Sequence, residues 1–216
     1  MLHRKTCSPS VSILVLAFVF CAVPLFAAPA TAVADQNGDR LSRGIRAHNA
    51  INGGDDSQIE AALSLLGSDG WDRPNLALAY HGSVLTLEAA RAKKEGKLME
   101  ALGLIDRGTK EIDEALRRDP TMVDLRILRM ENSMALIESS PVDRKKETSE
   151  DIDFLREQWN SLGAEWKATV ELDSGRLALA NKHINEALSS WRKAELAAPG
   201  SDAANRAKKL LARYGD

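Results

Sequence analysis

The sequence predicts an all-α protein. From residue 74 to residue 216, apolar residues recur every three or four positions in almost every long segment, which is the spacing of an amphipathic helix. No run alternates apolar and polar residues as a half-buried strand would. Helix-breaking residues interrupt the pattern at short connections, so we expect consecutive helices to pack as antiparallel neighbours around a single core.

Residues 1–34 predict a secretory signal peptide. Basic residues at positions 3 to 5 precede an apolar run over 11–26, and small residues offer Ala-x-Ala cleavage sites after Ala32 or Ala34. A retained transmembrane anchor is the alternative. However, the run is shorter than the roughly 20 apolar residues that span a membrane, and it contains Pro24.

Both cysteines, Cys7 and Cys21, lie within this segment, so we expect no thiol or disulfide in the mature chain. Cys21 follows large apolar residues where a lipoprotein signal would have small ones. We therefore expect a periplasmic or secreted protein without a lipid anchor and without a membrane span after cleavage.

Composition places the mature chain among globular proteins, with 44% hydrophobic and 28% charged residues in the whole sequence. Removing Arg4 and Lys5 from the 29 basic residues leaves 27 against 31 acidic ones, a net charge of −4. Nucleic-acid binders usually show a basic excess on one face. We therefore expect no nucleic-acid partner.

Residues 35–73 predict a short helical N-terminal segment. Two amphipathic stretches, 41–51 and 59–66, end at glycine-rich breaks. The main domain then covers 74–216, and its first helix is expected to begin with Asp72 as N-cap and Pro74 in the first turn. Breaks further along the chain predict helices over 74–93, 98–118, 122–138, 143–160, 164–180, 183–197 and 202–213, the last one capping the domain.

The last helix pair before this cap resembles a tetratricopeptide repeat, a helix pair with small residues where its two helices cross and a terminal proline. Gly175 stands in the first helix. The second helix carries Ala187, Trp191, Ala194 and Pro199, where alanines allow close approach, the tryptophan fills space and the proline stops the helix.

An earlier pair has the same layout, with Gly82 in its first helix and Gly108, Ala115 and Pro120 in or after its second. Its linker over 93–98 is longer than the repeat allows, which indicates an insertion. The pair over 122–160 lacks the terminal proline and is a degenerate copy. The whole resembles exported bacterial tetratricopeptide-like proteins, and the resemblance implies a short α-solenoid of stacked helix pairs.

The helix expected over 122–138 has two apolar faces, which predicts that it is sandwiched between neighbours. Two polar strips separate these faces, and one of them is expected to line a groove. One strip holds Arg126, Arg129 and Ser133, and the other holds Asp124, Glu131 and Glu138.

In stacked helix pairs the first helix of each pair lines the concave side. The resemblance therefore makes Tyr80, Arg126, Arg129, Asn132 and Arg176 candidates for a partner-binding groove. The alternative is that the arginines are solvated or paired with neighbouring acids. For Asn132, which lies within an apolar face, the alternative is a structural hydrogen bond.

The sequence shows no constellation for catalysis, a cofactor or a metal. His48, His81 and His183 have no ligand spacing, and phosphate loops and nucleophile elbows are missing. Trp159, Trp166 and Trp191 are expected in the core, with a sugar-binding shelf as the alternative reading.

The expected function is a non-enzymatic interaction module of the cell envelope that binds another protein or a peptide. One alternative is an accessory subunit of an envelope transport or assembly complex, with the stack as scaffold. The other is an enzyme whose carboxylates meet only in the folded chain.

Overall fold

The computed structural model describes residues 30–69 and 71–215, and within these ranges the chain is helical and contains no strand. The all-α class is confirmed. Most of the predicted signal peptide lies outside the described residues. The helices are α1 (Ala30–Asn52), α2 (Ile59–Leu66), α3 (Asn75–Lys94), α4 (Leu98–Arg118), α5 (Val123–Ser139), α6 (Lys145–Glu157), α7 (Ala164–Ala180), α8 (Ile184–Ala197) and α9 (Asp202–Tyr214), with short 3₁₀ turns η1 (Asp56–Gln58) and η2 (Trp159–Ser161).

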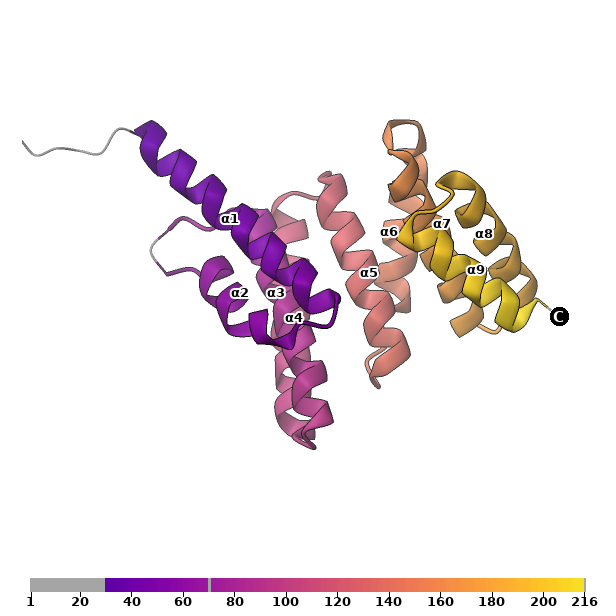
Figure 1. Ribbon diagram of the computed structural model, residues 1–216, viewed down its shortest axis with the longest axis horizontal. Coiled ribbons are helices and arrows are strands. Elements are labelled where there is room, and N and C mark those ends of the chain that lie inside the picture. Colours follow the sequence, from indigo (N-terminus) through magenta and orange to yellow (C-terminus); the bar gives the residue numbers. More distant parts are fainter. Residues whose placement is uncertain (1–29, 70, 216) are drawn as a thin grey trace, which may run out of the picture.

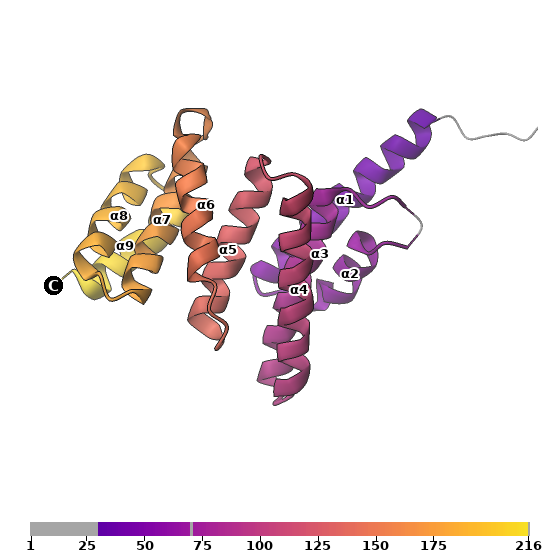
Figure 2. The same ribbon diagram turned by 180° about the vertical axis from the view of Figure 1, so that it is seen from behind.

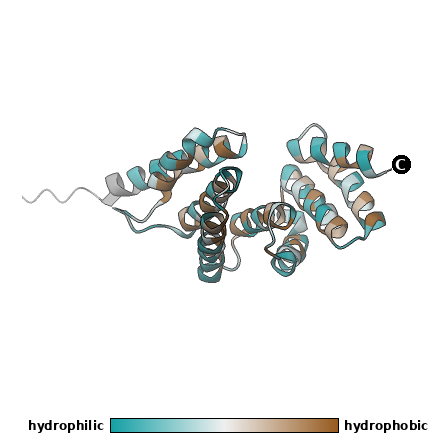
Figure 3. Ribbon diagram, turned by 90° about the horizontal axis from the view of Figure 1, so that it is seen from below, coloured by the Kyte–Doolittle hydropathy of each residue, from teal (hydrophilic) through white to brown (hydrophobic). Residues whose placement is uncertain are grey.

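Helices that follow one another in the chain pack side by side, with α3 against α4, α5 against α6 and α7 against α8 (Figures 1 and 2). Helices α3, α5 and α7 also contact one another in turn. Seen from below, the helices follow an arc, with α1 near one end and the C-terminal helix at the other (Figure 3). The candidate site lies on the inner side of this arc.

The start of α3 differs from the prediction. Pro74, with an extended backbone, is the N-cap, and its carbonyl accepts the first helical hydrogen bond from Leu78 at 3.0 Å. Asp72 therefore lies outside the helix. A proline disfavours helical geometry in the residue before it, here Arg73, so the helix cannot extend back across Pro74.

Two other boundaries depart from expectation. The first helix is longer than the predicted 41–51, because α1 begins at Ala30. The segment expected as one helix over 143–160 divides at Gln158 into α6 and η2.

The buried apolar residues form successive clusters along the arc rather than one continuous core. Helices α3, α5 and α7 each contribute to more than one cluster. In α5, Ile127 and Met130 pack toward α6 and α7, while Leu125 and Leu128 pack toward α3 and α4. The prediction that this helix is sandwiched between two neighbours is confirmed.

Glycines mark the closest helix crossings. A methyl group on Gly82 would meet the carbonyl oxygen of Gly108, and the reverse also holds, so α3 and α4 touch through their backbones. A methyl group on Gly175 would collide with the indole of Trp191, which is fully buried. The remaining residues of the predicted repeat signature are three buried alanines and two prolines just after helix ends: Ala115, Ala187, Ala194, Pro120 and Pro199.

The predicted long linker over 93–98 is wrong. Only three residues separate α3 from α4, and Gly96 takes the left-handed conformation there with φ of 81°. The extra length lies in the helices themselves, which extend beyond their neighbours as a projecting hairpin (Figure 1). Its tip exposes Leu98, Met99 and Leu102.

Candidate partner-binding groove

A groove runs along the inner side of the arc. Its largest hollow has a volume of about 590 Å³ and takes residues from α1, α3, α5, α7 and α9. Two adjoining hollows, of about 330 and 250 Å³, share Arg206 with it, and the larger of the two also shares Glu131 and Asp202. We treat the three hollows as one surface and call it the groove.

Hydrogen-bonding side chains from three helices meet on the floor of the groove. Nε2 of His48 lies 2.9 Å from the hydroxyl of Ser83, and Nδ1 lies 3.2 Å from Oδ1 of Asn49. Asn132 of α5 donates to the hydroxyl of Thr86 at 2.6 Å and approaches that of Ser83 at 3.4 Å. This network fixes α1, α3 and α5 relative to one another.

His48 is uncharged at neutral pH. Burial lowers its pKa from the ordinary value of 6.5, and the hydrogen bond to Asn49 only partly opposes that effect. A neutral imidazole that donates from Nδ1 to Asn49 and accepts at Nε2 from Ser83 satisfies both contacts.

The contact between Ser83 and His48 joins a hydroxyl to a neutral base. Acyl transfer also needs preorganised donors for an oxyanion. Ser83 lies well inside α3, where the backbone N–H groups bond the carbonyls of the preceding turn. These N–H groups are therefore not free to stabilise an oxyanion. We therefore interpret the cluster as a structural hydrogen-bond network beneath the groove, which is the alternative expected for Asn132.

Glu131 stands in the wall of the groove. It is exposed by surface area, yet it lies in a concave hollow whose walls displace much of the surrounding water. This desolvation, together with the negative charge of Asp173, raises the pKa of Glu131 to about 7. Near neutral pH Glu131 is thus only partly ionised.

Among the predicted groove residues, the structure places Asn132 and Arg176 on the groove surface. Arg176 is held on both sides, donating to Glu138 of α5 at 2.7 and 2.5 Å and to Asp173 at 2.5 Å. It is 9% exposed, so its edge is available while its charge is already balanced.

Arg126 and Arg129 do not line the groove. Both donate to the buried carboxylate of Asp151 on α6, Arg126 at 2.9 Å and Arg129 at 2.7 and 2.8 Å. Tyr80 also lies away from the groove surface and packs edge-on against His48, with ring centroids 4.9 Å apart. The opposite strip of α5, which holds Glu131, faces the groove instead.

Of the three tryptophans expected in the core, Trp191 is fully buried and Trp159 is half-buried. For Trp166 the prediction is wrong, because this residue is 41% exposed and lines the groove. It lies in the first turn of α7.

Sequence reasoning missed His48, Ser83, Thr86 and Arg206 as groove residues. Glu131 was recognisable as part of one of the two polar strips on its helix. The others carried no signal, because they come together only through the curvature of the whole chain.

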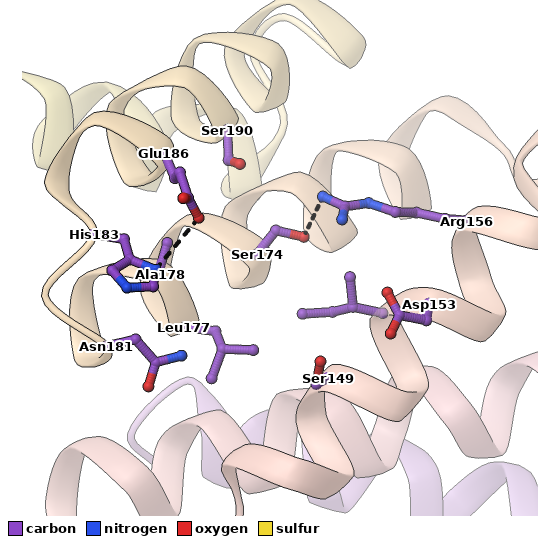
Figure 4. Close-up of a pocket in the computed structure, with 11 residues that line it drawn as sticks. Ser149, Asp153, Arg156, Ser174, Leu177, Ala178, Asn181, His183, Glu186 and Ser190 are labelled. Atoms are coloured by element: carbon purple, nitrogen blue, oxygen red, sulfur yellow. Dashed lines mark hydrogen bonds and ion pairs between the residues drawn. The ribbon is translucent and has the colours of Figure 1, made fainter.

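A further hollow of about 220 Å³ lies between α6, α7 and α8 (Figure 4). Its residues from α7, such as Ser174 and Ala178, stand on the opposite side of that helix from Leu172 and Arg176, which line the groove. Polar groups here pair locally: Arg156 donates to Ser174 at 3.1 Å, and His183 lies 3.5 Å from Glu186.

The described residues contain no cluster of three or more His, Cys, Asp or Glu side chains placed to hold a metal ion. No helix in the same ranges combines the length and apolar character needed to cross a membrane. No family of known proteins, no curated protein and no solved structure matches the chain.

Proposed function

We propose that the protein is an exported interaction module, built from tetratricopeptide-like helix pairs, that binds an extended peptide segment of a partner along the groove. The observation that carries this proposal is the continuity of the groove across five helices. Glycine contacts at the crossings of α3 with α4 and of α7 with α8 support the repeat-like pairing.

The dimensions suit a short extended chain. Two successive helix-to-helix steps of about 10 Å carry the groove roughly 20 Å from α3 to α7. An extended chain rises about 3.3 Å per residue, so about six residues fit this length. Exposed polar side chains on the groove walls, such as Glu131 and Arg206, can form hydrogen bonds with such a chain.

Export through the signal peptide over 1–34 would place the module in the periplasm or outside the cell, as the basic start and apolar run support. The mature chain would hold no cysteine there. Its stability would thus depend on noncovalent interactions, without disulfides.

The test fills the groove without disturbing the core. Ala135 of α5 is exposed and lines the groove, so Ala135→Trp adds bulk there. Ala61 of α2 is exposed outside the groove, and Ala61→Trp is the matched control. Peptides of about ten residues, selected from a displayed random library on the wild-type protein, are measured by fluorescence anisotropy.

We expect Ala135→Trp to weaken the selected peptides by at least about tenfold, a loss of about 1.4 kcal/mol, and Ala61→Trp to leave them unchanged. Equal binding to both variants, or a library that yields no binder, would contradict groove recognition.

One observation favours the alternative of an accessory subunit of an envelope complex. The tip of the projecting hairpin exposes Leu98 and Met99 at 59% and 81%, an apolar surface suited to a permanent partner. Crosslinking in intact cells separates the two functions. Adducts lost in Met99→Glu but kept in Ala135→Trp would favour the scaffold role.

A further inference from the structure

The four tryptophans of this chain have different surroundings. Arg40 stacks on Trp71 at 4.6 Å, and Lys167 lies over Trp159 at 5.7 Å. Trp191 is completely buried. Trp166 is the exposed one at 41%, and within the described residues no cationic side chain stacks on it.

Trp166 shares its hollow of about 330 Å³ with an excess of negative charge. Glu131, Glu165 and Asp202 face a single guanidinium, that of Arg206. Arg206 contacts Asp202 only at 3.7 Å, and both side chains are largely exposed, so this pair is weak. An aromatic face bordered by carboxylates is the composition that holds an ammonium or guanidinium group.

A second observation concerns Asp173, a buried acid on α7, the helix that also carries Trp166. Asp173 is 1% exposed, and its Oδ2 has no hydrogen-bond partner, although Arg176 neutralises Oδ1. After burial, its charge is the largest contribution to the raised pKa of Glu131, which Arg206 and Arg176 oppose. The hollow therefore has more negative potential than its own cations balance. The charged and titratable groups that surround Glu131 are His48 on α1, Tyr80 on α3, Glu165, Asp173 and Arg176 on α7, and Asp202 and Arg206 on α9.

We propose that the hollow formed by Trp166, Glu131, Glu165 and Asp202 receives a lysine or arginine side chain of the bound peptide. This rests on the proposed function and assigns the groove a basic peptide segment. The cation stacks on Trp166 and pairs with Glu131, which becomes fully ionised as the cation enters.

The hollow can be tested without a partner. The probes are Nα-acetyl-arginine methylamide and its citrulline counterpart, which has nearly the same shape but no charge. Indole N–H signals of the purified protein are followed by NMR, and the Trp166 signal is assigned with Trp166→Phe. We expect the arginine probe to shift the Trp166 signal and the citrulline probe to leave it in place. The Trp71 and Trp159 signals, whose rings already face cations, serve as internal references.

Two variants identify the groups responsible. Glu131→Gln removes the central carboxylate and Trp166→Leu removes the ring. Glu186→Gln, on α8 and on the far side of α7, is the matched control. Because Glu131→Gln removes a poorly solvated charge, it should leave the fold at least as stable, so a lost response cannot be attributed to unfolding. We expect each groove variant to weaken binding of the arginine probe about tenfold, and we expect the control to bind the probe as the wild-type protein does.

Peptide binding distinguishes the two proposals. Selected peptides are resynthesised with arginine or citrulline at each basic position. Binding that falls about tenfold on this exchange in wild type, but not in Glu131→Gln, supports the cation site. Peptides that bind without regard to the exchange would overturn the cation site and leave the groove function standing. If the arginine probe shifts the Trp166 signal but no selected peptide binds, the cation site would stand and the proposed groove function would be overturned.

Discussion

The carboxylate of Asp151 on α6 is buried against the guanidinium of Arg129 on α5, which donates to it from Nε at 2.7 Å and from Nη2 at 2.8 Å. Arg126 adds a third donor at 2.9 Å, and its guanidinium stacks on Phe154 at 4.6 Å. The pair thus joins the two helices of the central repeat-like unit, the one that lacks glycine contacts and a terminal proline.

Removing one partner of this pair should destabilise the fold. Arg129→Met leaves the buried charge of Asp151 with less compensation, and we expect a loss of about 3 to 5 kcal/mol in the free energy of unfolding. Urea titration followed by circular dichroism measures it. Arg117→Met, at an exposed pair with Glu114, is the control and should change stability by less than about 1 kcal/mol. A loss no larger than that of the control would show that the pair is dispensable.

Glu131→Gln should increase stability above neutral pH. In the folded chain the pKa of Glu131 is raised to about 7, above its ordinary value of 4.5. The folded state therefore holds the proton more tightly, and stability decreases as pH rises from 4.5 to about 7. Thermal midpoints measured at pH 5 and pH 8 should fall less in the variant than in wild type. Parallel profiles would show that Glu131 ionises normally.

The ionisation of His48 should change stability with pH in the opposite direction. Burial lowers its pKa below 6.5, so the unfolded chain binds the proton more readily, and stability is lost as pH falls below 6.5. His48→Gln replaces the imidazole with a neutral side chain that can still bond Ser83. Its unfolding free energy should decline less between pH 7 and pH 5, as measured by urea titration. An unchanged decline would assign that part of the profile to other groups.

Two glycines of α4 should respond in opposite directions to the same substitution. Gly108→Ala forces a methyl group onto the backbone of α3, and we expect a loss of about 1 to 3 kcal/mol. Gly103 has no atom within 4 Å of the added methyl, so Gly103→Ala should gain about 0.5 to 1 kcal/mol from helix propensity. Differential scanning calorimetry compares both. A Gly108→Ala protein as stable as wild type would exclude close contact at this crossing.

Helix positions were predictable because they depend on local periodicity and on local stop signals. The bounds of α4 and α7 coincide with the sequence prediction, since the connections at Asp119–Pro120 and around Gly163 leave little freedom. The two-sided burial of α5 was visible for the same reason.

The direction of the groove was not predictable. Arg126 and Glu131 belong to opposite strips of α5, and a single sequence gives both strips similar polarity. The strip with Arg126 is covered because both of its arginines bind a buried acid, Asp151, on the next helix. That information lies about 20 residues further along the chain and becomes visible only after α6 docks.

The division of the core into successive clusters has a mechanical consequence. Each cluster joins only helices that are close in the chain, and α3, α5 and α7 act as the shared walls. Small rotations at each of these shared helices add up along the arc, as they do between the repeats of a solenoid. Such rotations would let the distance between α1 and α9 change while every cluster stays packed. Hydrogen exchange should then be graded along the chain, with each cluster opening at its own free energy.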